Sequence, residues 1–156
     1  MTKLGNKYGF TLIEALLVVA ILGLLVAFII PAVNLASRSR ENALAARKLQ
    51  TAVEAFELYA AETGGYPPDR TPGVIPPEMT DYYFPYFKID WWGDSTELGG
   101  SWDWDNGYHF NFSVSIAVPT RSQAQMQEFD RLIDDGDLTT GNFRQVGTQY
   151  HYIIED

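Results

Sequence analysis

Gly9-Phe10-Thr11-Leu12-Ile13-Glu14 opens the stretch that decides the fold, an apolar run that continues to Ile30 with Glu14 as its only charged residue. About 21 residues with a rise of 1.5 Å each form a helix of roughly 31 Å, which matches the hydrocarbon thickness of a bilayer. The run is too long for the apolar core of a secretory signal peptide, and nothing like Ala-x-Ala follows it. Residues 10–30 are therefore predicted to cross a membrane as a helix.

Two lysines, then Gly9, then the sequence Phe-Thr-Leu-Ile-Glu and an apolar helix resemble the N-terminus of the type IV pilin and type II secretion pseudopilin superfamily. The resemblance covers about the first 31 residues. In that family a prepilin peptidase of the membrane cuts after the glycine and methylates the new N-terminal residue. The resemblance thus implies leader cleavage between Gly9 and Phe10, N-methylation of Phe10, an assembly contact at Glu14 and a helix kink at Pro31.

The carboxylate of Glu14 is costly within a membrane, by a few kcal/mol at the bilayer centre and less near the interface. A cost of this size predicts a partner. Cleavage would create a cationic amine at Phe10, and in a helical bundle of subunits Glu14 is expected to pair with the amine of a neighbour. The alternative is a protonated or snorkelling Glu14 that has no role.

The charges around the span bear on its orientation. Lys3 and Lys7 precede the span and favour a cytoplasmic N-terminus, whereas basic residues after it oppose that bias. The resemblance implies a single-pass protein of the bacterial inner membrane with an exported headpiece, which then enters a periplasmic or surface filament. The implied partners are the prepilin peptidase, other pilin or pseudopilin subunits in a homopolymer, and an inner-membrane assembly platform.

Composition limits the remainder of the chain. Of 156 residues, roughly 125 are left for one small exported domain after the leader and the span. The net charge of −9 becomes −11 once Lys3 and Lys7 are removed (−9 − 2), which argues against a nucleic-acid partner. The chain has no cysteine, unlike many adhesive pilins, which close a C-terminal loop with a disulfide. This composition suits a pseudopilin better.

After Pro31 the helical pattern becomes amphipathic, because apolar residues recur on one face at Ala45, Leu49, Val53, Phe56 and Ala60. Pro31 is predicted to kink the helix or melt it locally. Gly64 and Gly65 are predicted to end it. The predicted organisation is a leader at 1–9, a transmembrane segment at 10–30, an amphipathic stem helix at 31–63 and a globular headpiece at 64–156.

The headpiece begins with an irregular stretch, residues 66–100, that is rich in Pro, Gly and aromatic residues. We expect a packed loop there with one helical turn near 77–83. Tyr66-Pro67-Pro68 and Asp90-Trp91-Trp92-Gly93 resemble a Tyr-Pro turn and an Asp-Pro-Trp-Gly turn of major pseudopilins. In the second turn Trp91 replaces the proline.

The clearest strand is predicted over 108–118, where bulky residues alternate with small or polar ones. Its hairpin partner is predicted at 100–104, with Asp105-Asn106-Gly107 as the turn. Thr120 is predicted to cap a helix that Gly136 stops, and a single strand is predicted over 143–154. The predicted fold class is α+β: a long N-terminal helix packed on a small antiparallel sheet of three or four strands, as in pilins.

No pattern in the headpiece predicts an enzyme. His109 and His151 stand far apart in the sequence, with no metal-ligand spacing and no Gly-x-Ser-x-Gly motif. Calcium is the one candidate ligand, at Asp90, Asp94, Asp103 and Asp105, because the ion prefers hard oxygen ligands and major pseudopilins bind calcium in a comparable loop. The spacing of these residues does not fit a calcium-loop motif, and a solvated acidic turn is the favoured alternative.

Two further groups have open interpretations. The second acidic group, at Asp134, Asp135 and Asp137, is expected to be a helix end and turn, with a bound ion as the less favoured alternative, although acidic residues there oppose the helix dipole. The tryptophans of the headpiece would form a small aromatic core or, if exposed, bind sugars or a secreted partner. The core is the favoured interpretation. The four tryptophans are Trp91, Trp92, Trp102 and Trp104.

Together these patterns predict a structural filament subunit, with a pseudopilin of a type II secretion-like system favoured over a subunit of a type IV pilus. The rival from another class is a membrane-anchored exported binding domain that does not polymerise.

Overall fold

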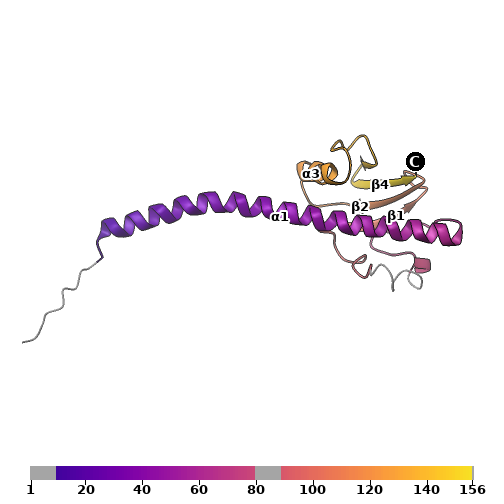
Figure 1. Ribbon diagram of the computed structural model, residues 1–156, viewed down its shortest axis with the longest axis horizontal. Coiled ribbons are helices and arrows are strands. Elements are labelled where there is room, and N and C mark those ends of the chain that lie inside the picture. The colour runs from indigo at the N-terminus through magenta and orange to yellow at the C-terminus, as the bar shows by residue number, and fades with distance from the viewer. Residues whose placement is uncertain (1–9, 80–88, 156) are drawn as a thin grey trace, which may run out of the picture. The chain divides into compact units, whose positions relative to one another are not determined.

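The computed structural model describes residues 10–79 and 89–155 (Figure 1). The chain divides into two compact units, one up to Ser37 and the other from Arg38 onward. Helix α1 (Leu12–Thr63) contributes to both units, with its N-terminal part in the first and its C-terminal part in the second. The α+β fold class that the sequence predicts is confirmed, because this long helix is followed by a small antiparallel sheet.

The C-terminal part of α1 buries one face in the second unit. Its buried residues are Asn42, Ala45, Leu49, Ala52, Ala55 and Phe56. They include three of the five residues of the predicted stripe, while Val53 and Ala60 are half-buried. The helix ends where the two glycines predict: Gly64 has a φ of +84° and its N–H donates to the carbonyl of Ala60 at 2.9 Å.

Four antiparallel strands form the sheet in the described part of the headpiece. They are β1 (Ser101–Asn106), β2 (Phe112–Ala117), β3 (Phe143–Val146) and β4 (Gln149–Glu155), in the spatial order β1-β2-β4-β3. The central pair β2 and β4 comes from segments far apart in the chain. Strand order therefore brings residues of the first hairpin beside residues near the C-terminus.

The first hairpin turns later than predicted. Asp105 and Asn106 do not form the turn but stay in β1, paired with Ser113 and Phe112. The connection is formed by residues 107–111, where Gly107 has a φ of +81° and its N–H donates to the carbonyls of Phe110 and Asn111. The predicted strand at 108–118 is therefore shortened to β2, because its first four residues serve as the loop.

The C-terminal segment is a hairpin and not the single strand that its residue pattern predicts. β3 and β4 pair with each other from Phe143↔Tyr152 to Val146↔Gln149. Gly147, with a φ of +60°, allows the tight reversal between them. The segment predicted as one strand therefore contributes two strands, β3 and β4, to the sheet.

Helix α3 (Gln123–Ile133) connects the two hairpins. Its N-cap is Ser122, whose hydroxyl accepts a hydrogen bond from the N–H of Gln125, and not the predicted Thr120. Met126 and Phe129 are buried as the apolar stripe predicts, whereas Leu132 is exposed. The helix ends at Ile133, before Gly136, with Asp134 as its C-cap.

An aromatic cluster joins the inner face of the sheet to α1. Phe56 of α1 stacks on Trp104 of β1, with ring centroids 3.9 Å apart and planes within 6° of each other. Trp92 contacts the edge of Phe56 at 5.7 Å, and Tyr66 packs on Phe112 at 4.1 Å. The indole N–H of Trp104 donates to the carbonyl of Pro67 at 3.0 Å, so the predicted Tyr-Pro turn is tied to this core.

The irregular stretch before β1 is packed, as predicted, where the structure describes it. Residues 77–79 are helical, Met79 and Ile89 are buried, and residues 80–88 lie outside the described part of the chain. This stretch also occupies the outer edge of β1. The N–H of Gly73 donates to the carbonyl of Trp102 at 2.7 Å, and Ser95 forms an isolated bridge with Ser101.

The substitution Phe56→Ala tests the aromatic cluster. We expect it to lower the free energy of unfolding by about 3–5 kcal/mol, because it removes the ring on which Trp104 stacks and leaves a cavity. Urea unfolding of the full chain in detergent, followed by tryptophan fluorescence, measures the loss. Leu58→Ala on the exposed side of α1 is the control and should cost about 0.5 kcal/mol or less. Equal losses for the two variants would contradict this role of Phe56.

Candidate functional site

The N-terminal part of α1 presents apolar side chains to its surroundings on all sides. Every described residue from Phe10 to Ile30 is exposed, and α1 is the one helix in the described chain that is long and apolar enough to cross a membrane. A helix that is apolar around its whole circumference is stable only within lipid or against other apolar helices. This property agrees with the predicted transmembrane segment.

Thr11 and Glu14 form a capping box at the start of α1. The N–H and the hydroxyl of Thr11 both donate to Oε2 of Glu14 at 2.8 Å, and the N–H of Glu14 donates to the hydroxyl of Thr11 at 3.3 Å. Each of the two residues satisfies an otherwise unpaired group at the first turn. Glu14 therefore has an intrachain partner, Thr11, in addition to the predicted partner in a neighbouring subunit, and the Thr-x-x-Glu spacing is itself a signature of the box.

The other predicted residues of this segment are placed as follows. Phe10 is exposed and directly precedes the capping box, and Gly9 lies outside the described residues. α1 stays helical through Pro31, so the helix is not melted there, and the kink remains a prediction. Cleavage and methylation likewise remain predictions.

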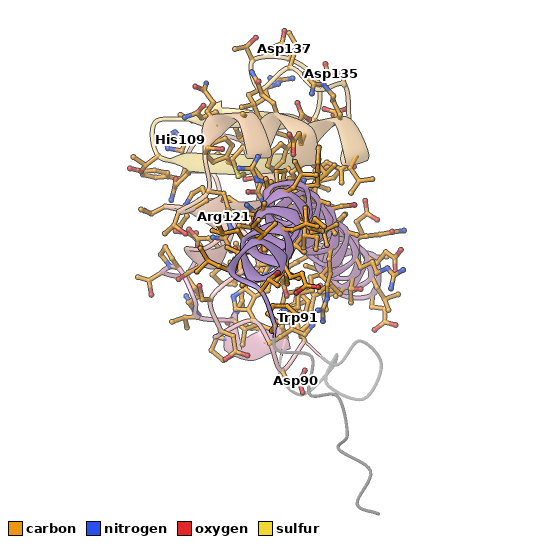
Figure 2. All side chains as sticks on the ribbon, turned by 90° about the vertical axis from the view of Figure 1, so that its left-hand side faces the viewer. Asp90, Trp91, His109, Arg121, Asp135 and Asp137 are labelled. Atoms are coloured by element: carbon orange, nitrogen blue, oxygen red, sulfur yellow. The ribbon has the colours of Figure 1, made fainter. Side chains whose placement is uncertain are left out.

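The four aspartates predicted to bind calcium do not come together as one group. Asp90 and Asp94 are exposed in a turn, whereas Asp103 and Asp105 are buried in β1. In the described chain, the three carboxylates that do approach one another closely enough to share an ion are Asp130, Asp134 and Asp135. Figure 2 places Asp135 at the opposite end of the headpiece from Asp90.

Asp103 and Asp105 belong to a buried polar cluster on the face of the sheet that points away from α1. Because neighbours in a strand alternate between faces, these residues oppose Trp102 and Trp104 of the core. Pairing of the strands sets Asp103 opposite Ser115 and Ser115 opposite His151. The polar cluster comprises Asp103, Asp105, Ser113, Ser115 and His151, and all five are buried. The sequence predicts the polarity of this face but not its burial.

His151 connects two strands within the polar cluster. Its Nδ1 lies 3.1 Å from the hydroxyl oxygen of Ser113 and 3.3 Å from Oδ2 of Asp105, while its Nε2 has no hydrogen-bond partner. In a hydrolytic triad the serine and the aspartate use different ring nitrogens, so this arrangement does not prepare Ser113 as a nucleophile. The ring of His109, which is distant in sequence, lies 5.2 Å from that of His151.

Asp103 has the most strongly altered acidity in the polar cluster. Burial raises the pKa of its carboxyl group to about 8, and the negative charges of Asp105 and Asp69 add to the effect. The three aspartates line a cavity of about 490 Å³ together with Arg70 and Tyr108. At neutral pH the neutral form of Asp103 therefore dominates.

The tryptophans form the aromatic core that the sequence favours. Trp92, Trp102 and Trp104 are buried in the core, and Trp91 is half-buried against them. The ammonium group of Lys48 lies 5.1 Å from the ring centroid of Trp91. These side chains stabilise the headpiece and do not form an exposed binding surface.

Comparison with known proteins assigns the N-terminal segment. Residues 4–30 match the model of the prokaryotic N-terminal methylation motif, which is the signature of type IV pilins and pseudopilins. The matched range contains Gly9, Phe10 and Glu14. The chain matches no curated protein and no solved structure. This signature covers the N-terminal segment, and the apolar helix there is compatible with membrane anchoring.

The raised pKa of Asp103 predicts how the free energy of unfolding depends on pH. The folded state holds a proton on this carboxyl group up to about pH 8, whereas the unfolded state loses it near the ordinary value of 3.8. The free energy of unfolding should therefore fall as pH rises from about 4 to about 8 and then level off. Asp103→Asn should flatten this slope and increase the free energy of unfolding at pH 8 by about 1–3 kcal/mol.

Urea unfolding at a series of pH values measures the slope. Burial also raises the pKa of Asp130, to about 6, so the Asp103→Asn variant should keep a smaller slope below that pH. Asp94→Asn, at an exposed position, is the control and should leave the wild-type slope unchanged. A full wild-type slope in Asp103→Asn would contradict the assignment.

Proposed function

We propose that this chain, which carries the N-terminal signature of type IV pilins and pseudopilins, is a structural subunit of a type IV filament. It is cleaved after Gly9, N-methylated at Phe10 and polymerised through its N-terminal helix. The methylation motif at residues 4–30 is the observation that carries the proposal. The exposed apolar start of α1 supports it, because such a surface needs lipid before assembly and the helices of other subunits afterwards.

The proposed partners follow from the proposed cleavage, methylation and polymerisation. A prepilin peptidase removes the leader in the inner membrane, an assembly platform extracts the subunit, and further copies or related subunits complete the filament. The headpiece faces the periplasm or the cell exterior. Its acidic character, with a net charge of −9 for the whole chain, disfavours a nucleic-acid partner.

Within this class we favour a pseudopilin of a type II secretion-like system over a pilus subunit. The absence of cysteine supports this choice. So does the Tyr66-Pro67-Pro68 turn, where the carbonyl of Pro67 accepts hydrogen bonds from Trp104 and Asn106 of β1. The genes beside this one distinguish the two systems: a secretion ATPase with an outer-membrane channel indicates secretion, and retraction components indicate a pilus.

Glu14 is proposed to change partners during assembly. In the isolated subunit its Oε2 accepts two hydrogen bonds from Thr11. These bonds offset part of the cost of a carboxylate near the membrane interface, but the negative charge remains. Pairing with the methylated amine of Phe10 in a neighbouring subunit neutralises that charge in an apolar bundle.

Processing is tested by the mass of the mature chain. We expect co-expression with a prepilin peptidase to yield a chain that begins at N-methylated Phe10. Intact-mass spectrometry, with tandem sequencing of the N-terminal peptide, measures both changes. A chain that keeps Met1 and still performs its cellular role would overturn the proposal and favour a membrane-anchored binding domain that does not polymerise.

Assembly is tested by separating the charge of Glu14 from its capping role. Glutamine can occupy the third position of a capping box, so Glu14→Gln should preserve the start of α1 while removing the charge. We expect Glu14→Gln and Glu14→Ala to be inserted and cleaved normally, and each to reduce the yield of sheared filaments at least about tenfold, because both remove the charge that pairs with the neighbouring amine.

Thr11→Ala is the matched control, because it removes the capping hydroxyl and keeps the carboxylate. It should assemble far better than Glu14→Gln. Wild-type filament yield from Glu14→Gln would refute the charge pairing, and a loss confined to Glu14→Ala and Thr11→Ala would assign the role of Glu14 to capping alone.

A further inference from the structure

Three aspartates from two segments of the headpiece line one cavity of about 490 Å³. Asp69 belongs to the stretch before β1, whereas Asp103 and Asp105 are two residues apart in β1 and therefore lie on the same face of that strand. Tyr108 of the first hairpin loop and Gln149 of β4 line the same space. Its volume is within the range of small-ligand sites. We call this space the aspartate cavity.

Asp103 offers a free acceptor atom at the aspartate cavity. Its side chain is 3% exposed, and its Oδ1 has no hydrogen-bond partner. The hydrogen bond that its carboxyl group does receive comes from the backbone N–H of Trp104, which leaves Oδ1 free. An acceptor that is already shielded from water gains more from a new donor than an exposed one does. Asp103 is therefore suited to bind a ligand that carries hydrogen-bond donors.

The charges around Asp103 favour a cation as that ligand. Burial, followed by the charges of Asp105 and Asp69, raises the pKa of Asp103 to about 8. Burial and the charge of Asp105 also raise the pKa of Asp69. A proton on Asp103 relieves the repulsion among the three carboxyl groups, and a cation that enters the cavity would take over this role.

The cations of the headpiece near this cavity have other partners. Arg70 lines the cavity, but its guanidinium group donates to the carbonyl oxygen of Asp69 at 3.0 Å and pairs with Glu78 at 3.4 Å. Nδ1 of His151 lies 3.3 Å from Oδ2 of Asp105. Among the described residues, neither side chain forms an ion pair with Asp103. The cavity can therefore accept a cation from another molecule.

The acceptors favour an ammonium group over a guanidinium group or a metal ion. A guanidinium group binds best to both oxygens of one carboxylate, whereas Asp103 offers Oδ1 alone. An ammonium group has three diverging donors and suits single acceptors from separate residues. Tyr108, which is 71% exposed, adds an aromatic face for cation–π contact. The three carboxylates do not form one of the close groups in the described chain that could share a metal ion.

We propose that the aspartate cavity binds a primary alkylammonium group, supplied by a free amine or by a lysine side chain of a partner protein. The ammonium group donates to Oδ1 of Asp103 and to carboxylate oxygens of Asp69 and Asp105, and the alkyl chain lies against the ring of Tyr108. Binding releases the proton of Asp103 to solvent. The site lies in the headpiece, away from the methylation motif, so this inference does not depend on filament assembly.

Calorimetry with two probes tests the ligand class. The full chain in detergent is titrated with pentylammonium chloride and with Nα-acetyl-lysine methylamide, and we expect a Kd of about 1 mM or lower for at least one of them at pH 7.5. Binding of the lysine probe identifies a partner protein as a source of the group, and binding confined to pentylammonium identifies a free amine. No binding heat from either probe, or equal affinity for Nα-acetyl-arginine methylamide, would overturn the proposal.

Proton release separates this site from general attraction to an acidic surface. Titrations at pH 7 in two buffers of different ionisation enthalpy should show release of about half a proton or more per bound probe. Affinity should rise about tenfold from pH 6.5 to pH 8.5, because the ionised form of Asp103 binds the cation more tightly and its fraction grows up to about pH 8. The other titratable or charged groups that line the cavity or lie beside it are Asp69, Asp105, Arg70, Tyr108 and His151.

Variants assign the binding to Asp103. Asp103→Asn leaves those other groups in place, and it should abolish the proton release and weaken binding at least about tenfold. Asp69→Asn, at an exposed position, should also weaken binding, and it tests the site even if Asp103→Asn fails to fold. The matched control is Asp94→Asn, which removes one exposed carboxylate outside the cavity and should bind as the wild type does. Wild-type affinity in both Asp103→Asn and Asp69→Asn, or wild-type proton release in Asp103→Asn, would overturn the assignment.

Discussion

The first half of helix α1 needs apolar surroundings and the second half needs one face covered, and the rest of the chain is organised around this difference. Up to Ile30 the side chains of α1 are exposed and apolar on every side, whereas from Asn42 only one face is apolar, and it is buried. The buried face needs a cover, which the inner face of the sheet supplies through Trp104 stacked on Phe56. The headpiece is thus the structure that keeps the second half of α1 soluble.

The parts of the fold that depend on local patterns could be predicted from the sequence. Helix periodicity and the glycines after Thr63 define α1, and the Phe-Thr-Leu-Ile-Glu motif defines the candidate processing site. The turns were less predictable, because Asp105 and Asn106 are typical turn residues that instead pair with Ser113 and Phe112. The Thr11–Glu14 capping box follows from the local Thr-x-x-Glu spacing, whereas the membrane cost of Glu14 predicts only that its carboxylate needs a partner.

The buried polar groups could not be predicted, because they depend on contacts between distant segments. His151 meets Ser113 only because β4 pairs with β2, a consequence of strand order that no local pattern contains. Asp130 resembles any acidic residue of a surface helix in the sequence, yet its side chain is fully buried in the folded headpiece. Composition shows that the chain is acidic, but the fold determines which acidic side chains are buried.

The contacts at the rim of the sheet limit how copies of this chain can combine. β1 is an edge strand, yet Gly73 already occupies the carbonyl of Trp102, and Ser95 bridges to Ser101. An exposed strand edge is the usual template for adding a strand from another molecule. A second chain would have to displace these segments before it could extend the sheet. The β1 edge of the headpiece therefore resists growth by strand addition.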